Sequence, residues 1–294
     1  MIAFLTIFSI RYISFPQYCK EDVTHDISKI EIHMIDVGQS ESILIIQGEN
    51  TMLIDTGDIW SGKVVSNYIR DMGIDTIDVL VLTHFHQDHV GGAHKVISSF
   101  NIGEIICMDN QYCSTQMEQI WSLDIKIAKN VSSIFHCSKI SVKSPYTKSG
   151  KLRMFMLGEA KVEFLSHENT ELVVNNKSIV TKITFGDFSA LLMADAELNV
   201  ERKLLESDID LSADLLKVGH HGSRTSTGEE FLELVNPEYA IISCGIGNDY
   251  LHPHLSVLKK LEKQNIKIYR TDIDGDILII SDGKDDDLEI VTKK

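Results

Sequence analysis

The stretch THFHQDHVGG, residues 83–92, decides how this chain folds and what chemistry it can carry. It places His84, His86, Asp88 and His89 close together, directly after the apolar run DVLVL at residues 78–82. A short continuous apolar run of this kind predicts a buried strand, so the polar cluster follows a strand end. Clustered histidines have no packing purpose there, which favours a binding site over a solvated loop.

The residue types in this cluster indicate a metal site. Imidazole and carboxylate groups at this density are typical ligands of Zn²⁺, Mn²⁺ or Fe²⁺. The spacing lets His84 and His86 share one metal ion while Asp88 and His89 face a second. Two close cations would activate a water for attack and stabilise negative charge on the attacked group, so we expect a hydrolytic site with two divalent metal ions, Zn or Mn. Asp88 would serve both as ligand and in catalysis.

The pattern around the cluster indicates the fold. Residues 30–37, 42–46 and 52–54 form a meander of short predicted strands, and residues 62–72 have helical spacing and end at Gly73. The second half repeats this order: predicted strands at 161–165, 178–185 and 189–193 precede helices and strands that alternate from 197 to 280. Two such halves predict an α/β protein, a four-layer αββα sandwich with two sheets face to face. Residues 107–150 are less regular and are predicted to be an insertion or lid.

Composition limits the partners and the domain count. The 294 residues carry a formal net charge of −15, which argues against extended, sequence-independent binding of nucleic acid. It does not exclude phosphodiester cleavage, because bound cations supply positive charge locally. The apolar run at residues 1–10 is too short to span a bilayer as a helix. We predict a leader at 1–28, either an export signal or anchor or a surface-packed segment, and a hydrolase domain at 29–294.

The motifs together resemble the metallo-β-lactamase superfamily, through H-x-H-x-D-H, the following glycine pair and LIDTG at residues 53–57. Within it, the chain resembles the hydrolase domain of ComEC-type DNA-uptake channel proteins of competent bacteria and their stand-alone relatives. The matching segments are HMIDVGQSES (33–42), THFHQDHVGG (83–92), NKSIV (176–180), LLMADAE (191–197), LKVGHHGSRTS (216–226), NDYLHP (248–253) and RTDIDG (270–275). The resemblance therefore covers nearly the whole chain after the leader.

The resemblance implies further site residues. Asp195 would bridge the two metals and act in catalysis, and a histidine of the His220–His221 pair would complete the second metal. His220 is favoured because it follows the predicted strand, although spacing does not decide between the two. The other imidazole would contact substrate. Asp55 would orient a ligand histidine, with a turn aspartate that caps backbone amides as the alternative.

Several positions depart from the superfamily pattern. Where many members have a third histidine ligand for the first metal, this chain has Asn175, Asn176 and Lys177. ComEC-type relatives are likewise rich in asparagine there. His167 lies upstream and is more typical of a surface loop. The usual glycine–aspartate pair of VGQGDS is Ser40–Glu41 here, and the usual glycine before the bridging aspartate is Ala194. The asparagines leave the first metal with fewer protein ligands, whereas neither the Ser40–Glu41 change nor the Ala194 change removes a ligand.

The candidate substrate contacts come from the resemblance and have alternatives. The resemblance places NDYLHP at the mouth of the site, where His252 would hold a substrate oxygen or donate a proton, unless it is a structural histidine. Asn248 and Ser223 are candidate substrate contacts, and Ser223 with Arg224 could equally be ordinary loop residues.

The expected activity is that of a metal-dependent hydrolase acting on an anionic ester. The resemblance favours a phosphodiesterase or nuclease, with single-stranded DNA as a candidate substrate. One alternative is a small-substrate hydrolase of a phosphorylcholine ester or lactone at the cell surface, and another is a ligand-binding pseudoenzyme. The protein would be secreted or anchored through residues 1–28, or otherwise cytoplasmic. The sequence gives no indication of an oligomeric state.

Overall fold

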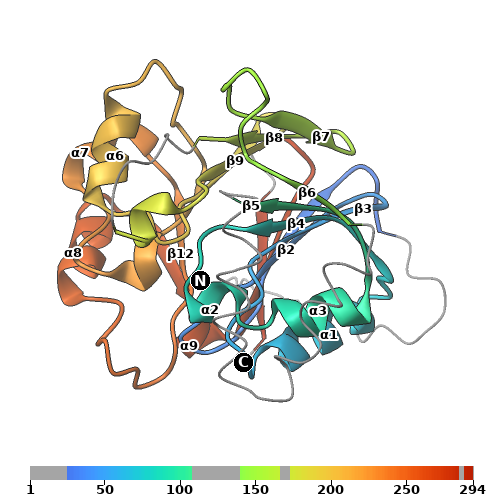
Figure 1. The fold of residues 1–294 in the computed structure, drawn as a ribbon. Coiled ribbons are helices and arrows are strands. Elements are labelled where there is room, and N and C mark those ends of the chain that lie inside the picture. The colour runs from blue at the N-terminus through green and yellow to red at the C-terminus, as the bar shows by residue number, and fades with distance from the viewer. Residues whose placement is uncertain (1–24, 108–139, 166–172, 285–287, 294) are drawn as a thin grey trace, which may run out of the picture.

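The computed structural model describes residues 25–107, 140–165, 173–284 and 288–293. Its first sheet has the strand order β15-β14-β1-β2-β3-β4-β5-β6 (Figure 1). The strands from β15 to β3 are antiparallel, and β3 to β6 are parallel. Their bounds are β1 Ile30–Met34, β2 Ile43–Gln47, β3 Asn50–Ile54, β4 Thr76–Leu82, β5 Asn101–Cys107, β6 Ser141–Lys143, β14 Asp276–Ser281 and β15 Leu288–Lys293.

The second sheet repeats this arrangement in the order β13-β12-β11-β10-β9-β8-β7. The strands β7 to β10 are antiparallel and β10 to β13 are parallel. Their bounds are β7 Met154–Leu157, β8 Ala160–Phe164, β9 Thr181–Phe185, β10 Phe188–Leu192, β11 Leu215–Lys217, β12 Tyr239–Ile242 and β13 Lys267–Arg270.

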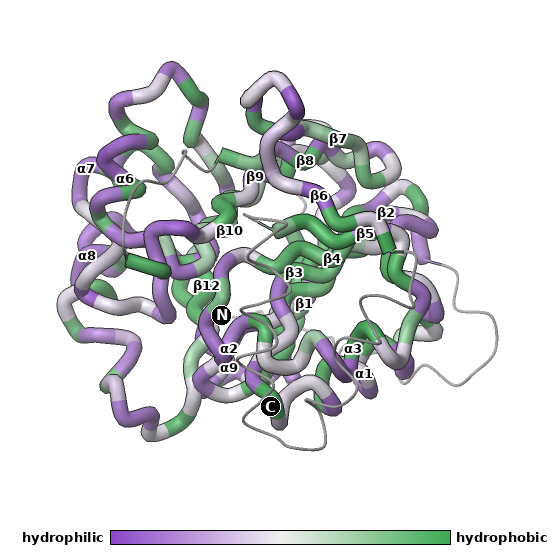
Figure 2. The backbone as a smooth tube through the Cα atoms, in the orientation of Figure 1, coloured by the Kyte–Doolittle hydropathy of each residue, from purple (hydrophilic) through white to green (hydrophobic). Residues whose placement is uncertain are grey.

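Three apolar layers separate four structural layers, which confirms the predicted αββα sandwich. The central layer holds inward side chains of both sheets, such as Ile32 and Ile183. A second layer joins the first sheet to α1 (Gly62–Asp71) and α3 (Ala93–Ser99), and a third joins the second sheet to α6 (Leu198–Leu205), α7 (Glu229–Val235) and α8 (Leu255–Lys263). Figure 2 shows the consequence: the strands are predominantly apolar, whereas the helices alternate apolar and polar residues.

The two sheets place their functional loops at one edge of the sandwich. The cluster at residues 84–89 follows β4 and enters the short helix α2 (Gln87–Val90). Asp195 lies three residues after β10, and the turn Gly219–Gly222 follows β11. Loops that follow strands of both sheets thus meet over one position, as the carboxyl ends of strands in α/β proteins commonly do.

Most predicted elements are present with shifted ends. Gly73 follows α1 with φ 74°, as expected of a glycine after a helix. The strand predicted from residue 178 begins at Thr181, because the Ile179 amide donates to the Thr83 carbonyl instead of to a neighbouring strand. Most of the predicted leader, most of the predicted insertion and His167 lie outside the described residues. Within the described part of the chain, no helix has the length and apolar character needed to cross a membrane.

Candidate metal centre

The motif loop divides its ligands between two positions because a helix begins inside it. His84 and His86 precede α2, with His86 in extended backbone at its N-cap, whereas Asp88 and His89 lie within that helix. His84 Nε2 lies 3.1 Å from His86 Nδ1 and 3.7 Å from Asp195 Oδ2. The Nδ1 of His84 faces the hydroxyls of Thr83 and Ser178, at 3.2 and 3.4 Å, so its other nitrogen is directed into the site.

Asp195 joins the two positions. Its Oδ1 lies 3.3 Å from His89 Nε2, while its Oδ2 faces His84. The amide of Asp195 donates to the Ser178 hydroxyl at 3.1 Å, and the side chain is buried. One carboxylate therefore presents a separate oxygen to each histidine group, which is the arrangement required of a bridging ligand.

The residue before it explains a departure noted in the sequence. Ala194 has φ 47°, in the left-handed region that glycine adopts without steric cost. A left-handed alanine costs about 1–2 kcal/mol, part of which glycine gives back as unfolded-chain entropy. We expect Ala194→Gly to raise the free energy of unfolding by about 0.5–1 kcal/mol, measured by urea denaturation. An unchanged or lower stability would contradict this account.

The paired histidines diverge because both have left-handed backbone, with φ 48° at His220 and 53° at His221. His221 is buried: its Nδ1 donates to the Ser243 carbonyl at 2.8 Å, and its Nε2 lies 3.5 Å from Asp195 Oδ1 and 3.6 Å from Asp88 Oδ2. His220 is more exposed, and its Nε2 lies 3.8 Å from Asp195 Oδ2. The geometry thus groups His221, rather than the favoured His220, with His89. His220 lies on the side of His84, where Asn175 Nδ2 approaches it at 3.3 Å.

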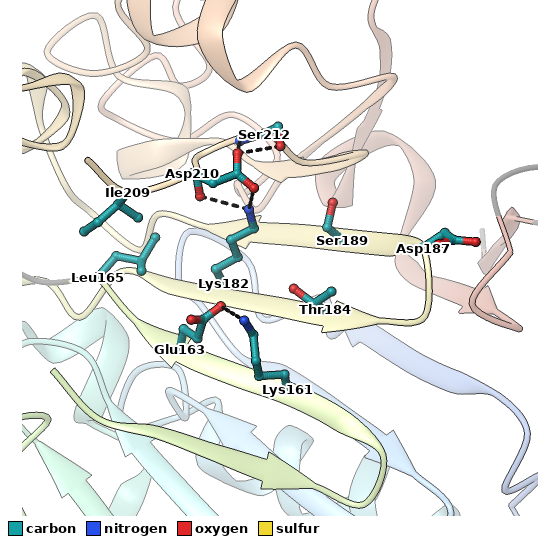
Figure 3. A pocket seen from close by; sticks show the side chains of 10 residues that line it. All are labelled: Lys161, Glu163, Leu165, Lys182, Thr184, Asp187, Ser189, Ile209, Asp210 and Ser212. Carbon is teal, nitrogen blue, oxygen red and sulfur yellow. Dashed lines mark hydrogen bonds and ion pairs between the residues drawn. The ribbon is translucent and has the colours of Figure 1, made fainter. Parts of the chain in front are cut away.

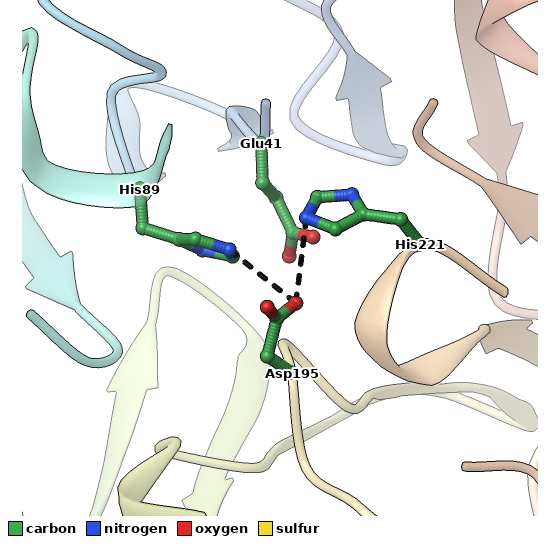
Figure 4. Close-up of side chains that lie close together, drawn as sticks. All are labelled: Glu41, His89, Asp195 and His221. Carbon is green, nitrogen blue, oxygen red and sulfur yellow. Dashed lines mark ion pairs between the residues drawn. The ribbon is translucent and has the colours of Figure 1, made fainter. Parts of the chain in front are cut away.

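Two groups of side chains have the spacing of metal ligands. One comprises His84, His86 and Asp195; the other comprises Glu41, His89, Asp195 and His221, drawn in Figure 4. Within each group, one ligand atom per residue lies within 4.8 Å of the others. In the second group, four buried atoms have no hydrogen-bond partner in the described residues: Glu41 Oε1, His89 Nε2, Asp195 Oδ1 and His221 Nε2. Buried polar atoms are rarely left unpaired, so these residues fit a bound cation.

The buried carboxylates of the second group stabilise positive charge at this position, which a metal cation would supply in place of a proton on His89. Burial lowers the pKa of His89, but the carboxylates of Asp195 and Asp55 outweigh it and raise that pKa well above its ordinary value. Burial raises the pKa of Asp195, but His89 and His221 hold it well below its ordinary value. The pKa of His84 is lowered by burial and by His89, which leaves a neutral imidazole whose lone pair is available to a metal.

Asp55 contacts His89 on the side away from Asp195 and holds it in place. It is fully buried, and its Oδ2 accepts from His89 Nδ1 and from the Thr83 hydroxyl, both at 2.6 Å. Its Oδ1 accepts from the Thr83 amide at 2.9 Å. These contacts match both sequence interpretations: the aspartate caps a backbone amide, and its bond to His89 Nδ1 leaves His89 Nε2 facing Asp195.

The site opens into a cleft of about 340 Å³, lined by Gln39, His86, Gln87, Asp88, Asp195, His220, His221, Tyr250 and His252. Asn248 does not line it: its amide donates to the carbonyls of Gly245 and His252, at 2.9 and 2.6 Å, and holds this rim loop. Ser223 is buried and accepts from Thr225. Both side chains are engaged within their own loops, so the geometry gives them a structural role.

His252 lines the cleft as a neutral imidazole. Its Nδ1 lies 3.3 Å from Gln39 Nε2, and burial, aided by His221 and His220, lowers its pKa to about 4. Of the two roles expected from the sequence, holding a substrate oxygen therefore fits better than donating a proton. We expect His252→Gln to lower the rate without changing the shape of the pH–rate profile between about pH 6 and 8. A rate that falls in the wild type alone as the pH rises through this range would reveal a protonated His252 in catalysis.

A larger cavity of about 510 Å³ lies away from this cluster, over β8, β9 and β10 (Figure 3). Four of its charged groups are paired with one another: Lys182 with Asp210 at 2.9 Å and Lys161 with Glu163 at 2.8 Å. None of its lining residues belongs to either ligand group, so size alone does not make it the functional site.

Glu41 is a site residue that sequence reasoning missed, as are Gln39 and Tyr250 of the cleft. The sequence indicates only that the change to Glu41 removes no ligand, yet its carboxylate lies within the second ligand group and is paired with the buried Lys217. No ligand spacing surrounds Glu41 in the sequence, because the packing of the two sheets brings it to the site.

Comparison with known proteins agrees with this geometry. The model of the metallo-beta-lactamase superfamily matches residues 35–115. ComE operon protein 3 of Bacillus subtilis (strain 168) is 30% identical over 268 residues, which are 85% of this chain and 33% of that protein. Competence protein ComA of Neisseria gonorrhoeae is 28% identical over 245 residues, 82% of this chain and 30% of that protein. The chain thus spans about a third of the length of these relatives.

The fold has a solved counterpart. The metallo-beta-lactamase fold protein YhfI from Bacillus subtilis superposes with a TM-score of 0.50 at 14% identity, over 82% of this chain and 95% of that one. An identity this low speaks for the fold alone, whereas the competence proteins match in sequence along most of this chain. Sequence relatives and architecture lead to the same assignment: the chain contains a metallo-β-lactamase domain with the fold of that superfamily.

Proposed function

We propose that this protein is a metal-dependent phosphodiesterase that cleaves single-stranded DNA. The observation that carries the proposal is the pair of ligand groups sharing Asp195 at the floor of a cleft that has Tyr250 at its edge. Two divalent cations bound there would activate water and neutralise charge on a phosphoryl group. The acidic net charge does not oppose this, because the cations would provide the positive charge that the substrate meets.

The chain's own residues would bind and orient the substrate. Asp88 and Asp195 would balance the charge of the cations, and Asp195 would keep them at a fixed separation. Because Gln39 contacts Nδ1 of His252, the other nitrogen is available to hold a substrate oxygen. The sequence resemblance to the hydrolase domain of DNA-uptake proteins supports a phosphodiester over the other esters that this superfamily cleaves.

Tyr250 is the reason to favour a single strand. Its side chain is 67% exposed at the rim, and its ring stacks on that of His252 with centroids 5.6 Å apart and an angle of 24° between the planes. An exposed aromatic ring stacks with unpaired bases, which a duplex keeps inside its own stack. A base on Tyr250 would place the adjoining phosphate toward the ligand groups.

The direct test is incubation of the purified protein, loaded separately with Mn²⁺ and with Zn²⁺, with end-labelled single-stranded DNA. An Asp88→Ala variant purified in parallel exposes contaminating nucleases. Degradation by the wild type alone is the expected result. Intact DNA under both metals would refute the proposal.

We expect Tyr250→Ala to raise the KM for single-stranded DNA about 10-fold, because stacking of one base contributes about 1–3 kcal/mol. Tyr250→Phe keeps the ring and should behave as the wild type. Hydrolysis of bis(p-nitrophenyl) phosphate should change little in either variant, since this small diester needs no base contact. Equal losses on both substrates would mean that Tyr250 shapes the site instead of holding a base.

A second candidate function is hydrolysis of a small anionic ester. The volume of the cleft, about 340 Å³, is within the range of small-molecule sites. Turnover of a phosphorylcholine ester or a lactone, with no cleavage of DNA, would favour it.

A further inference from the structure

Glu41 lies in the loop between β1 and β2, beside the short helix α2. Its amide donates to the Asp88 carbonyl at 3.0 Å, and its carbonyl accepts from the Gly57 amide at 2.8 Å. These two bonds hold the backbone of Glu41 against the loop of residues 83–92 and against the LIDTG turn of residues 53–57. The side chain is buried and points between His89 and His221 toward Asp195 (Figure 4).

The two oxygens of its carboxylate are in different situations. Oε2 accepts from the Nζ of Lys217, a buried residue of the second sheet that also donates to the Ala194 carbonyl at 3.1 Å. Oε1 is buried and has no hydrogen-bond partner in the part of the chain that the structure describes. A carboxylate that served Lys217 alone would not leave one oxygen unpaired among other unpaired ligand atoms.

We infer that Glu41 is a further protein ligand of the second metal, held in place by Lys217. One ligand atom each from Glu41, His89, Asp195 and His221 lies within 4.8 Å of the others, slightly wider than the span of about 4.4 Å that donors about 2.2 Å from one cation can have. Small side-chain movements would bring all four to one ion. Lys217 would fix the carboxylate as carboxylates commonly fix ligand histidines, so that one oxygen remains for the metal.

The two metal positions would then be unequal. With Asp88, the second position has three carboxylates and two imidazoles, whereas the first has His84, His86 and the shared Asp195. More oxygen donors favour a cation of higher coordination number, such as Mn²⁺. The second position should therefore fill first and bind Mn²⁺ more tightly.

The test counts metal and needs no substrate, so it is separate from the proposed function. Glu41→Gln alone would leave Lys217 charged, buried and unpaired, and could unfold the chain. The double variant Glu41→Gln, Lys217→Met removes both charges, and Glu41→Asp keeps the ion pair but withdraws the carboxylate by one methylene. Glu201→Gln is the matched control, because Glu201 is a buried glutamate that accepts from the Thr227 and Gly228 amides, outside both ligand groups.

Bound Mn²⁺ per chain is measured by elemental analysis after dialysis, and the dissociation constants by titration followed with electron paramagnetic resonance. In the double variant and in Glu41→Asp we expect the dissociation constant of the tighter Mn²⁺ site to rise about 10- to 100-fold, with an unchanged circular dichroism spectrum. The dissociation constants of Glu201→Gln should equal those of the wild type. Wild-type affinity in either folded variant would overturn the inference and leave Glu41 as a partner of Lys217 only. Failure to cleave DNA with intact metal binding would refute the proposed function and not this inference.

Discussion

Replacing Asp195 by asparagine is expected to remove at least one metal ion and to lower hydrolysis at least about 10³-fold. The carboxylate faces His89 and His221 with one oxygen and His84 with the other, so no neighbouring side chain can take over both directions. The amide of asparagine has the same shape but no negative charge, and its nitrogen has no lone pair available to bind a metal ion.

The measurement pairs metal content with the rate on the same preparation. Asp210→Asn is the matched control, because that aspartate is also paired with a basic side chain but lines the cavity away from the site. It should retain two metals and the wild-type rate. An Asp195→Asn variant that keeps both would mean that the ligand groups are not used as described.

Replacing Asp55 by asparagine is expected to lower the affinity of the second position for metal about 10- to 100-fold, although Asp55 is not in either ligand group. The same substitution should lower the free energy of unfolding by about 1–3 kcal/mol, because it disturbs three buried hydrogen bonds, two from Thr83 and one from His89.

A titration with Mn²⁺ and a urea denaturation of the metal-free protein separate the two effects. Asp78→Asn serves as the control, since Asp78 likewise accepts from a threonine amide and hydroxyl, those of Thr51, but contacts no ligand histidine. It should lose stability without losing metal affinity. If the metal constants of Asp55→Asn equal those of the wild type, Asp55 is a structural aspartate only.

The parts of the fold that were predictable are those with local signals. The buried strand before the motif, the helix that ends at Gly73 and the repeated order of strands and helices are each determined by spacing within a few residues. Strands with weak signals were missed: β15 follows a run of acidic residues, and its side chains are only partly buried at the sheet edge. The helix α3 was missed because it is short and directly follows the motif glycines.

The site was predictable where ligands share one loop and unpredictable where packing assembles them. The cluster at residues 84–89 is visible in six letters of sequence, and Asp195 came from the resemblance. Choosing between His220 and His221 required the left-handed backbone of both residues, which no spacing rule anticipates. Glu41 required the docking of two sheets, because its partner Lys217 is 176 positions away along the chain.

The origin of the ligands has a consequence for assembly. Glu41 and the motif histidines belong to the first half of the chain, whereas Asp195 and His221 belong to the second. A cation shared among them would act as a removable cross-link between the two sheets, with its full ligand set only when both have docked. Metal availability would thereby govern how long the docked sandwich survives against proteolysis, independently of any reaction that it catalyses.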